Sequence, residues 1–413
     1  MSLQSSRDRS FENAKRFEFP GLSALAQRAF RRLFSGIDRG SLVVTLPNGT
    51  QISAVGTRPG PTGVVSIHHM RAVRRLLFSG DVGVAQSYAD GDWTSPDLTA
   101  ALELGAVNDE TFARAMKGSR PAMLFNWLTH RLRANSRAGS RRNIAFHYDL
   151  GNDFYRSWLD PRMIYSSALF RPGVESLEAA QQEKLDRIVE LVDAEPGCNV
   201  LEIGCGWGAL ALELAQERGA RVTGLTLSRS QLRHAQGLAA RSPAGERMEF
   251  RLQDYRDVRG TFDRIVSVEM IEAVGQEYWP IFFAALRDRL APAGHVVLQA
   301  ITIADARFER YCRNPDFIQS CIFPGGTLPS RERMAQEAAR AGLSFEPMET
   351  FGASYARTLA EWRRRFEENG REIEALGFDQ RFRRLWEYYL CYCEGGFRAQ
   401  AIDVGLYRLK PLA

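Results

Sequence analysis

The chain has 413 residues, of which 45% are hydrophobic and 25% are charged, and its formal net charge is +5. Ordinary domains have about 150 residues, so we expect two or three domains. The composition excludes a disordered or fibrous protein. No stretch approaches the roughly 20 apolar residues that a membrane-spanning helix needs.

The N-terminus and the cysteines bear on the cellular compartment in which the protein works. The N-terminus carries no basic patch followed by an apolar core and a cleavage site, so we expect a cytoplasmic protein. The cysteines show neither a disulfide framework nor a second Cys/His pair at ligand spacing, so we expect reduced thiols and no metal site. They are Cys198, Cys205, Cys312, Cys321, Cys391 and Cys393.

The first part of the chain combines short strand and helix patterns. A Pro-Asn-Gly turn between two apolar runs predicts a hairpin. Helical patterns follow, broken by Gly80, Gly83 and the turn at residues 89–93. The predicted strands and helices are Ser41–Leu46, Gln51–Val55, Val64–Ile67, Met70–Phe78 and Asp97–Leu104. They predict a small α+β domain at residues 1–115.

Residues 116–142 form a predicted linker that mixes basic and apolar side chains. No acidic residue occurs between Glu110 and Asp149, whereas Phe125 and Trp127 lie among several arginines. This mixture is typical of helices that lie on anionic phospholipid surfaces. A solvated linker with a helix docked on the core gives the same pattern, so both interpretations stay open.

The third part, residues 143–413, contains strands that alternate with helices. This alternation predicts an α/β fold with a mostly parallel sheet, whose ligands bind beyond the carboxyl ends of the strands. The predicted elements are Asn199–Ile203, Ala209–Glu217, Arg221–Thr226, Ser230–Arg241, Met248–Leu252, Asp263–Val268 and Gly294–Ile301. We expect helices from Ser330 to Trp386 and a final strand at Ala401–Leu409.

A glycine-rich loop follows the first strand of this part. Gly204, Gly206 and Gly208 lie between an apolar strand and a helix, where a nucleotide loop lets the backbone approach its ligand. Glu202 stands two residues before the first glycine. An acid at this place suits S-adenosylmethionine (SAM), which has no pyrophosphate but carries a cationic sulfonium and an amino group.

Polar residues follow the next two strands. They are Thr226, Ser228 and Gln231 after the second strand, and Gln253, Asp254 and Tyr255 after the third. The first group can hydrogen-bond the ribose or the carboxylate of the cofactor. The second group offers a carboxylate for the adenine amine and a ring beside the base. An ordinary turn explains either group alone, but their order after successive strands favours cofactor binding.

A set of ordered motifs resembles the cyclopropane fatty acid synthase family, which includes the mycolic acid methyltransferases. Besides the glycine loop, the motifs are residues 84–93, Phe146–Tyr155, Ile164–Phe170, Gly224–Gln231, Gln253–Asp257, Ser267–Gly275, Ile322–Ser330, Phe351–Leu359 and Cys393–Arg398. The resemblance covers nearly the whole chain. It implies a Rossmann-like SAM-dependent methyltransferase with a seven-stranded, mostly parallel sheet and a lipid-associated N-terminal domain.

The resemblance also implies the reaction. The family moves a methyl group from SAM onto a cis double bond of an unsaturated acyl chain, usually in a membrane phospholipid. An alkene is a poor nucleophile, so the enzyme must align it with the sulfonium methyl and exclude water. Transfer leaves a carbocation, whose fate depends on where a base lies.

In the family, that base is thought to be a bicarbonate ion held by a polar cluster. Glu272 and Tyr355 keep the residue types of this cluster, and Ile301 occupies the position whose backbone contributes. Ser167 replaces the usual cysteine and Gln299 the usual histidine. Both can donate hydrogen bonds, but glutamine takes neither a proton nor a charge. Two products therefore stay open: a cyclopropane, or a methyl-branched or methylene chain.

The remaining site residues and partners are implied in the same way. Tyr165 and Ser166 match residues that contact SAM, and His147 and Cys393 lie in motifs of the family. A structural histidine and a packed cysteine are the alternatives. The family implies peripheral association with the inner face of the cell membrane. Relatives that make branched products do so with a partner enzyme, so a reductase or a desaturase and a second copy of the chain are candidate partners. No feature indicates nucleic acid.

Two other functions compete with this interpretation. A small-molecule N-methyltransferase would share the resemblance from the glycine loop to the C-terminus. The separate N-terminal domain and the basic linker argue against it, because a soluble amine requires neither. A non-catalytic lipid-binding protein would not need to keep Glu202, the three glycines, Gln231 and Glu272.

Overall fold

The computed structural model describes residues 27, 34–109, 150–313 and 315–412. The predicted linker at 116–142 and His147 lie outside these residues. Contacts divide the chain into two compact units, and the first combines residues 1–127 with Phe378–Ala401. The second unit contains residues 128–377 and 402–413. The prediction assigned everything after residue 142 to one domain, whereas the contacts group residues 378–401 with the N-terminal part.

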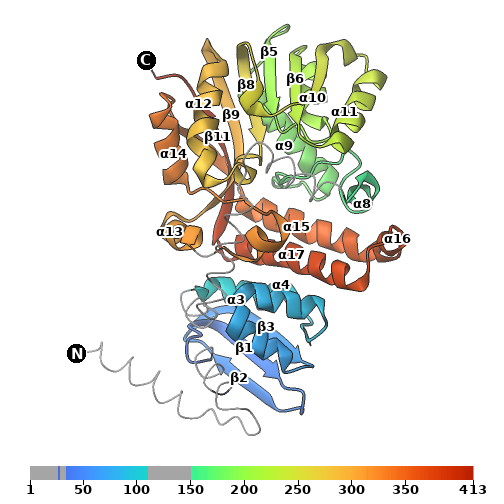
Figure 1. The fold of residues 1–413 in the computed structure, drawn as a ribbon, viewed down its shortest axis with the longest axis vertical. Coiled ribbons are helices and arrows are strands. Elements are labelled where there is room, and N and C mark those ends of the chain that lie inside the picture. Colours follow the sequence, from blue (N-terminus) through green and yellow to red (C-terminus); the bar gives the residue numbers. More distant parts are fainter. Residues whose placement is uncertain (1–26, 28–33, 110–149, 314, 413) are drawn as a thin grey trace, which may run out of the picture. The chain divides into compact units, whose positions relative to one another are not determined.

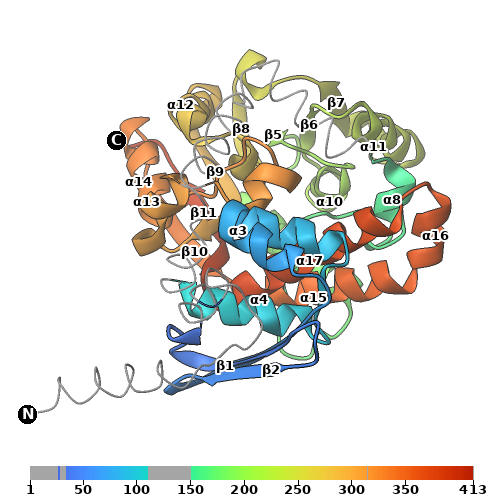
Figure 2. The same ribbon diagram turned by 60° about the horizontal axis from the view of Figure 1, so that its bottom comes forward.

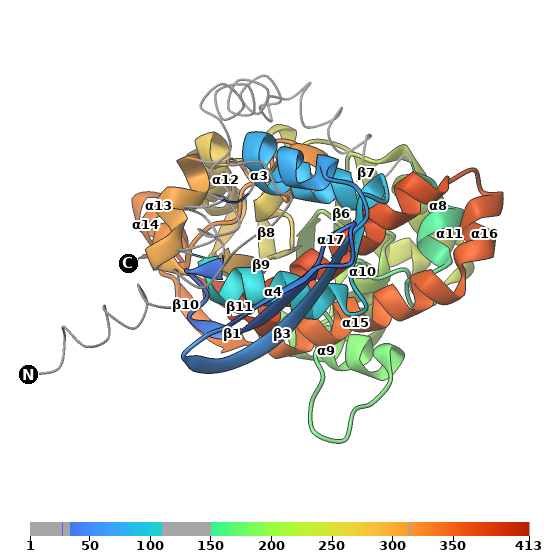
Figure 3. The ribbon, with the colours of Figure 1, turned by 90° about the horizontal axis from the view of Figure 1, so that it is seen from below.

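Among its described residues, the first unit contains a four-stranded sheet and three helices. The strand order is β2 (Gln51–Val55), β1 (Arg39–Thr45), β3 (Arg58–Ile67) and β4 (Trp93–Thr94). Strands β1 and β2 form the predicted antiparallel hairpin, and β3 runs parallel to β1. Helix α4 (Leu98–Val107) packs on β3 and β1, and α3 (Arg71–Ala89) and α4 both contact α17 (Gln380–Arg398) (Figures 2 and 3).

Helix α3 is longer than predicted. The prediction ended it at Phe78, but a helical segment continues to Ala89 beyond the non-helical Gly80, which has φ +60°. Gly80 therefore bends the helix without ending it, because a glycine adopts this backbone conformation at little cost.

The second unit has the predicted seven-stranded sheet (Figure 1). Its order is β10 (Glu346–Thr350), β11 (Ile402–Leu409), β9 (Leu290–Ile303), β8 (Phe262–Val268), β5 (Asn199–Ile203), β6 (Arg221–Thr226) and β7 (Met248–Leu252). Strands β5 to β9 run parallel to one another, and β11 runs antiparallel to both β9 and β10. The strand order reverses at β5, so a ligand is expected at the carboxyl ends beside it.

Helices complete the second unit. They are α8 (Asn152–Arg156), α9 (Leu177–Val192), α10 (Ala209–Glu217), α11 (Arg229–Arg241), α12 (Trp279–Arg289), α13 (Asp305–Arg313), α14 (Arg331–Arg340), α15 (Gly352–Glu368) and α16 (Gly370–Ala375). Short helical turns are η1 (Gly245–Arg247), η2 (Tyr255–Asp257), η3 (Ile271–Ala273), η4 (Gln276–Tyr278) and η5 (Ile318–Ile322). Across the described residues, no helix is both long and apolar enough to cross a membrane.

One predicted stretch is wrong. Residues 330–386 were expected to be helical, but β10 interrupts them at Glu346–Thr350. This pentapeptide contains a proline and two acids, so it shows no strand pattern. It forms a strand because it lies at the sheet edge, where proline is tolerated, and pairs with β11.

Leu104 joins the helices and the sheet of the first unit. It is 1% exposed, and a Cβ on Gly40 or Gly63 would lie 2.9 and 3.0 Å from its methyl groups. Leu104→Ala should therefore leave a cavity and lower the free energy of unfolding by about 3 kcal/mol. Chemical denaturation of the full chain measures this, with Val55→Ala, 78% exposed, as the control. Equal losses in both variants would contradict the packing role.

Candidate active site

The glycine loop begins at the carboxyl end of β5. Gly204, Gly206 and Gly208 have φ values of +84°, +53° and +95°, a region that side-chain-bearing residues rarely adopt. A Cβ on Gly206 would meet no atom within 4 Å, whereas one on Gly204 would lie 2.9 Å from the Met270 Cγ. The loop therefore leaves open space at Gly206 and lies close to the end of β8 at Gly204.

Glu202 of β5 is buried beneath this loop. It is 3% exposed, and its Oε2 atom has no hydrogen-bond partner among the described residues. Burial raises the pKa of Glu202 to about 8, opposed by the charge of Lys184. A cationic ammonium or sulfonium group of SAM beside this unpartnered oxygen would favour the ionised form of Glu202.

The residues after β6 are linked to one another. Ser228 caps α11, since its hydroxyl accepts from the Gln231 N–H at 3.3 Å. The Thr226 hydroxyl donates to Gln231 Oε1 at 2.8 Å and accepts from the Ser228 N–H at 3.1 Å. These three polar groups are therefore held in place at the strand end, where the sequence predicted the cofactor.

The residues after β7 have protein partners of their own. The Asp254 carboxylate forms an ion pair with Arg256 at 2.6 Å, and Gln253 donates to the Asp257 carbonyl at 2.9 Å. Tyr255 packs edge-on against Phe282. The Asp254 carboxylate is thus already paired within the chain. Its proposed contact with adenine stays a prediction.

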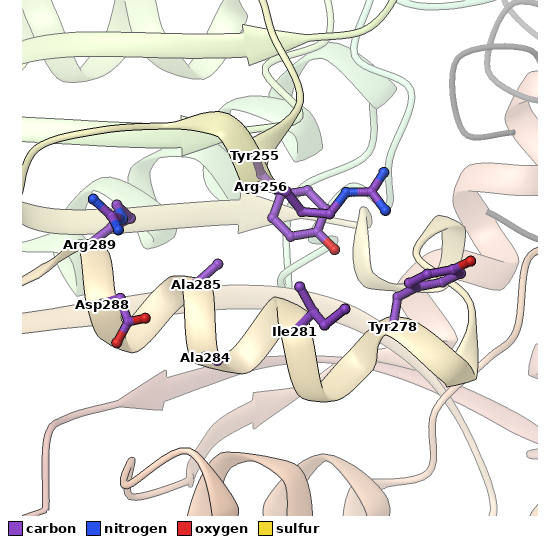
Figure 4. Close-up of a pocket in the computed structure, with 8 residues that line it drawn as sticks. All are labelled: Tyr255, Arg256, Tyr278, Ile281, Ala284, Ala285, Asp288 and Arg289. Atoms are coloured by element: carbon purple, nitrogen blue, oxygen red, sulfur yellow. The ribbon is translucent and has the colours of Figure 1, made fainter. Parts of the chain in front are cut away.

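A surface pocket of about 510 Å³ lies beside this turn (Figure 4). It is lined by Tyr255, Arg256, Tyr278, Ile281, Ala284, Ala285, Asp288 and Arg289. Most of these residues come from α12 and η4. Tyr255 is the one predicted cofactor residue among them, so this pocket is not the space at the glycine loop.

The Tyr165–Ser166 segment is anchored to helix α9. Lys184 donates to the Ser166 hydroxyl at 2.8 Å, and Gln181 donates to the Ser166 carbonyl at 3.0 Å. Tyr165 packs against Trp362 with ring centroids 5.3 Å apart. Burial lowers the pKa of Lys184 to about 8, opposed by the charges of Glu269, Asp160 and Glu202.

Lys184 and Gln181 were not singled out from the sequence. Both lie on the buried face of α9 with Leu177, Leu185 and Ile188. The sequence does contain a signal for them, since both are polar residues at core-facing positions of an amphipathic helix. Polar residues are rarely buried without a polar partner, so such positions indicate a buried hydrogen-bond network.

Asn152 is a third residue that was not singled out. Its Oδ1 atom accepts from the Trp207 indole N–H at 2.8 Å and from the Ser230 hydroxyl at 2.7 Å. Asn152 therefore joins the glycine loop to the start of α11. Its motif was recognised, but its partners lie 55 and 78 residues away.

A polar cluster forms around Glu269 at the end of β8. Glu269 Oε1 accepts from the Ser167 N–H at 2.8 Å and from Gln299 Nε2 at 2.7 Å. Glu269 Oε2 accepts from the Tyr355 hydroxyl at 2.6 Å. Three predicted residues thus converge, but on a carboxylate that the prediction did not include. Burial raises the pKa of Glu269, and these hydrogen bonds oppose the shift.

Glu272 and Ile301 form a second contact beside this cluster. Glu272 Oε1 accepts from the Ile301 N–H at 2.5 Å, while its Oε2 is buried without a hydrogen-bond partner among the described residues. Burial raises the pKa of Glu272 to about 8, and the negative charge of Glu269 adds to the shift. At neutral pH, we expect Glu272 to be protonated and Glu269, with three donors, to carry the charge.

The cluster suits proton transfer beside a cationic centre. It supplies a carboxylate that is held by three donors and a second acid that keeps its proton. Cys393 lies on α17 of the first unit. Its role, like that of His147, stays a prediction.

Comparisons with known proteins identify the proteins that this chain resembles. Residues 135–406 match the family model described as mycolic acid cyclopropane synthetase. The chain is 39% identical to the tuberculostearic acid methyltransferase of Mycobacterium tuberculosis, over 92% of this chain and 90% of that protein. It is 37% identical to the cyclopropane-fatty-acyl-phospholipid synthase of Escherichia coli, over 80% and 83%.

A solved structure shows the same similarity. It is a mycolic acid cyclopropane synthase complexed with SAH and CTAB, 31% identical, with a TM-score of 0.61. The matched region covers 65% of this chain and 97% of the chain in that structure.

The raised pKa of Glu202 predicts how stability changes with pH. Between its ordinary pKa of 4.5 and about 8, the folded chain keeps a proton that the unfolded chain has lost. This group therefore lowers the free energy of unfolding as the pH rises, by at most about 1.4 kcal/mol per pH unit. Glu202→Gln should make the decline less steep.

Urea unfolding between about pH 5.5 and about pH 7.5 measures this slope. The control is Glu249→Gln, because Arg251 lowers the pKa of that surface carboxyl below this window. An unchanged slope in Glu202→Gln would contradict the assignment.

Asn152→Ala should weaken SAM binding. The substitution leaves the buried Trp207 indole N–H without its acceptor and loosens the glycine loop, which we expect to cost about tenfold in affinity. Titration calorimetry with SAM measures the change. Asn48→Ala, which removes a side-chain cap from an exposed turn, is the control. Equal affinity in wild type and Asn152→Ala would exclude a role in ordering the loop.

Proposed function

This chain belongs to the mycolic acid cyclopropane synthetase family, and on that premise we propose that it methylates the cis double bond of an unsaturated acyl chain in a membrane phospholipid. SAM is the methyl donor. Proton loss from the resulting carbocation then gives a cyclopropane, or a methylene or methyl-branched unsaturated chain.

The observation that carries this proposal is the closeness of the cofactor loop to the polar cluster. Met270 lies against Gly204, and the preceding residue, Glu269, accepts three hydrogen bonds. The residue that lies against the cofactor loop and the residue that accepts three hydrogen bonds are thus neighbours in sequence at the end of β8. Alkene methylation followed by proton loss requires both groups beside the same double bond, because the cation forms on the carbon next to the methylated one.

Apolar side chains near the cluster support an acyl substrate. Trp362 is fully buried and packs edge-on against Tyr355, with ring centroids 6.1 Å apart. Phe317, Ile322 and Phe366 are also buried. Such a surrounding keeps water from a carbocation, which water would otherwise quench to an alcohol.

The membrane assignment rests on the first unit and the predicted linker. We propose that residues 1–115 and the basic residues of 116–142 bring the enzyme to the anionic inner face of the cell membrane. The substrate is a lipid, so an enzyme at the membrane surface reaches it without extracting it into water. A second copy of the chain and a reductase or desaturase that acts on the product are the proposed protein partners.

Incubation with labelled SAM tests the proposal. Phospholipid vesicles with cis-monounsaturated chains should receive label on the acyl chain, while vesicles of the same headgroups with saturated chains should receive none. Mass spectrometry of the released fatty acids should find one added carbon per modified chain.

Gly206→Val supplies the cofactor control. A valine cannot adopt the φ of +53°, and its side chain would enter the open space at the loop, so SAM binding and labelling should both be lost. Label that appears on a headgroup amine, or on no lipid while SAM is bound, would overturn the lipid C-methylation.

A further inference from the structure

We propose that the Glu269 carboxylate is the proton acceptor of the reaction, built into the chain at the place where related enzymes are thought to hold a bicarbonate ion. This inference rests on the proposed function, because it concerns the carbocation left by methyl transfer. It predicts that the wild-type enzyme needs no added anion.

The first support is the convergence of donors. Ser167, Gln299 and Tyr355 come from three separate segments and all donate to Glu269. By the resemblance, these positions belong to the cluster that would hold the ion. A free anion would find its donors occupied and would meet the charge of Glu269.

The second support is the backbone of Glu269. Its φ is +48°, in the left-handed region, which disfavours residues with a Cβ other than Asn and Asp. The Glu269 N–H donates to the Gln299 carbonyl at 2.8 Å. Gln299 therefore holds both the backbone and the carboxylate of Glu269. An unfavourable backbone conformation that the surroundings maintain at a site is a sign of function.

The third support is the charge state. Glu269 has three donors from other segments, whereas Glu272 Oε1 accepts from the Ile301 N–H and its Oε2 has no hydrogen-bond partner among the described residues. Two adjacent carboxyl groups repel each other when both are ionised, so one of them tends to stay neutral. Glu269 has more donors and is therefore the better place for the negative charge. A carboxylate offers about four acceptor positions, so one remains for a proton.

The chemistry balances with this single acceptor. The double bond supplies two electrons to the methyl carbon, the sulfonium–carbon bond breaks, and S-adenosylhomocysteine leaves with that electron pair. A C–H bond next to the cation or on the new methyl then breaks. Its electron pair closes the ring or forms a new double bond, and its proton goes to Glu269. No oxidant, reductant or co-reactant is required.

The test compares labelling of cis-monounsaturated phospholipid vesicles in carbonate-free buffer and in buffer with added bicarbonate. The wild-type rate should be the same in both. Glu269→Gly should lose about 100-fold or more without bicarbonate, because general base catalysis contributes at least this much. Added bicarbonate should restore a measurable part of the rate, since the glycine frees the three donors and leaves space for an ion.

Glu269→Gln is the matched variant. It fills the same space with a group that cannot take the proton, so its activity should be low with or without bicarbonate. SAM affinity and the melting temperature of each variant report whether it folds. A merely structural role would not make the rate of one variant depend on bicarbonate.

Asp193→Gly controls for the backbone. Asp193 is also an acidic residue in the left-handed region, with φ +46°, but it caps α9 at the surface. Its replacement should leave the rate and the response to bicarbonate unchanged. A wild-type rate that falls in carbonate-free buffer and returns with bicarbonate would overturn the inference alone, because lipid labelling would still occur. No lipid labelling under any condition would instead overturn the proposed function.

Discussion

The second unit depends on one constraint: several of its carboxyl groups are buried away from water, close to the proposed site of a cationic cofactor. An ionised carboxylate in such a place must be paired, hydrogen-bonded or neutralised. Glu269 is held by three hydrogen bonds, and the pKa of Glu272 is raised to about 8 so that it keeps its proton. Glu202 has the charge of Lys184 nearby and an oxygen without a partner, which leaves it ready for a cationic ligand.

The sheet topology places these groups together. Glu202, the glycine loop, Glu269 and Ile301 lie at or near the carboxyl ends of β5, β8 and β9, which are adjacent and parallel. The segment around Ser166 and Ser167 is tied to this edge by Lys184 and Glu269. The proposed donor site and the proposed proton acceptor therefore lie at one edge of the sheet.

The chain path makes the first unit discontinuous. Helix α17 belongs to the first unit, yet the next element, β11, lies between β9 and β10 of the second. Tyr88 donates to Glu387 at 3.0 Å, and Thr99 donates to the buried Glu394 at 3.0 Å, so α17 is bonded to α3 and α4 of its own unit. Removal of residues 1–115 would thus expose the face of α17 that packs on α3 and α4.

The sequence by itself determined the elements and the family. Strands β5, β6 and β7 and helix α10 have the predicted bounds, because hydrophobic periodicity and glycines act over a few residues. Glu272, Tyr355 and Ser167 were singled out because each lies in a local motif, and Gln299 was carried over from the family by its position in the predicted strand Gly294–Ile301. Strand β10 was missed, because its five residues are strand-like only through their pairing with β11.

The tertiary structure alone decided what those residues do together. Glu269 stood in a recognised motif, but its importance appears only when donors 30, 86 and 102 residues away meet its carboxylate. Lys184 and Asn152 were hidden for the same reason, and so was the membership of α17 in the first unit. A local pattern reports the neighbours of a residue along the chain, whereas charge and hydrogen bonding depend on neighbours in space.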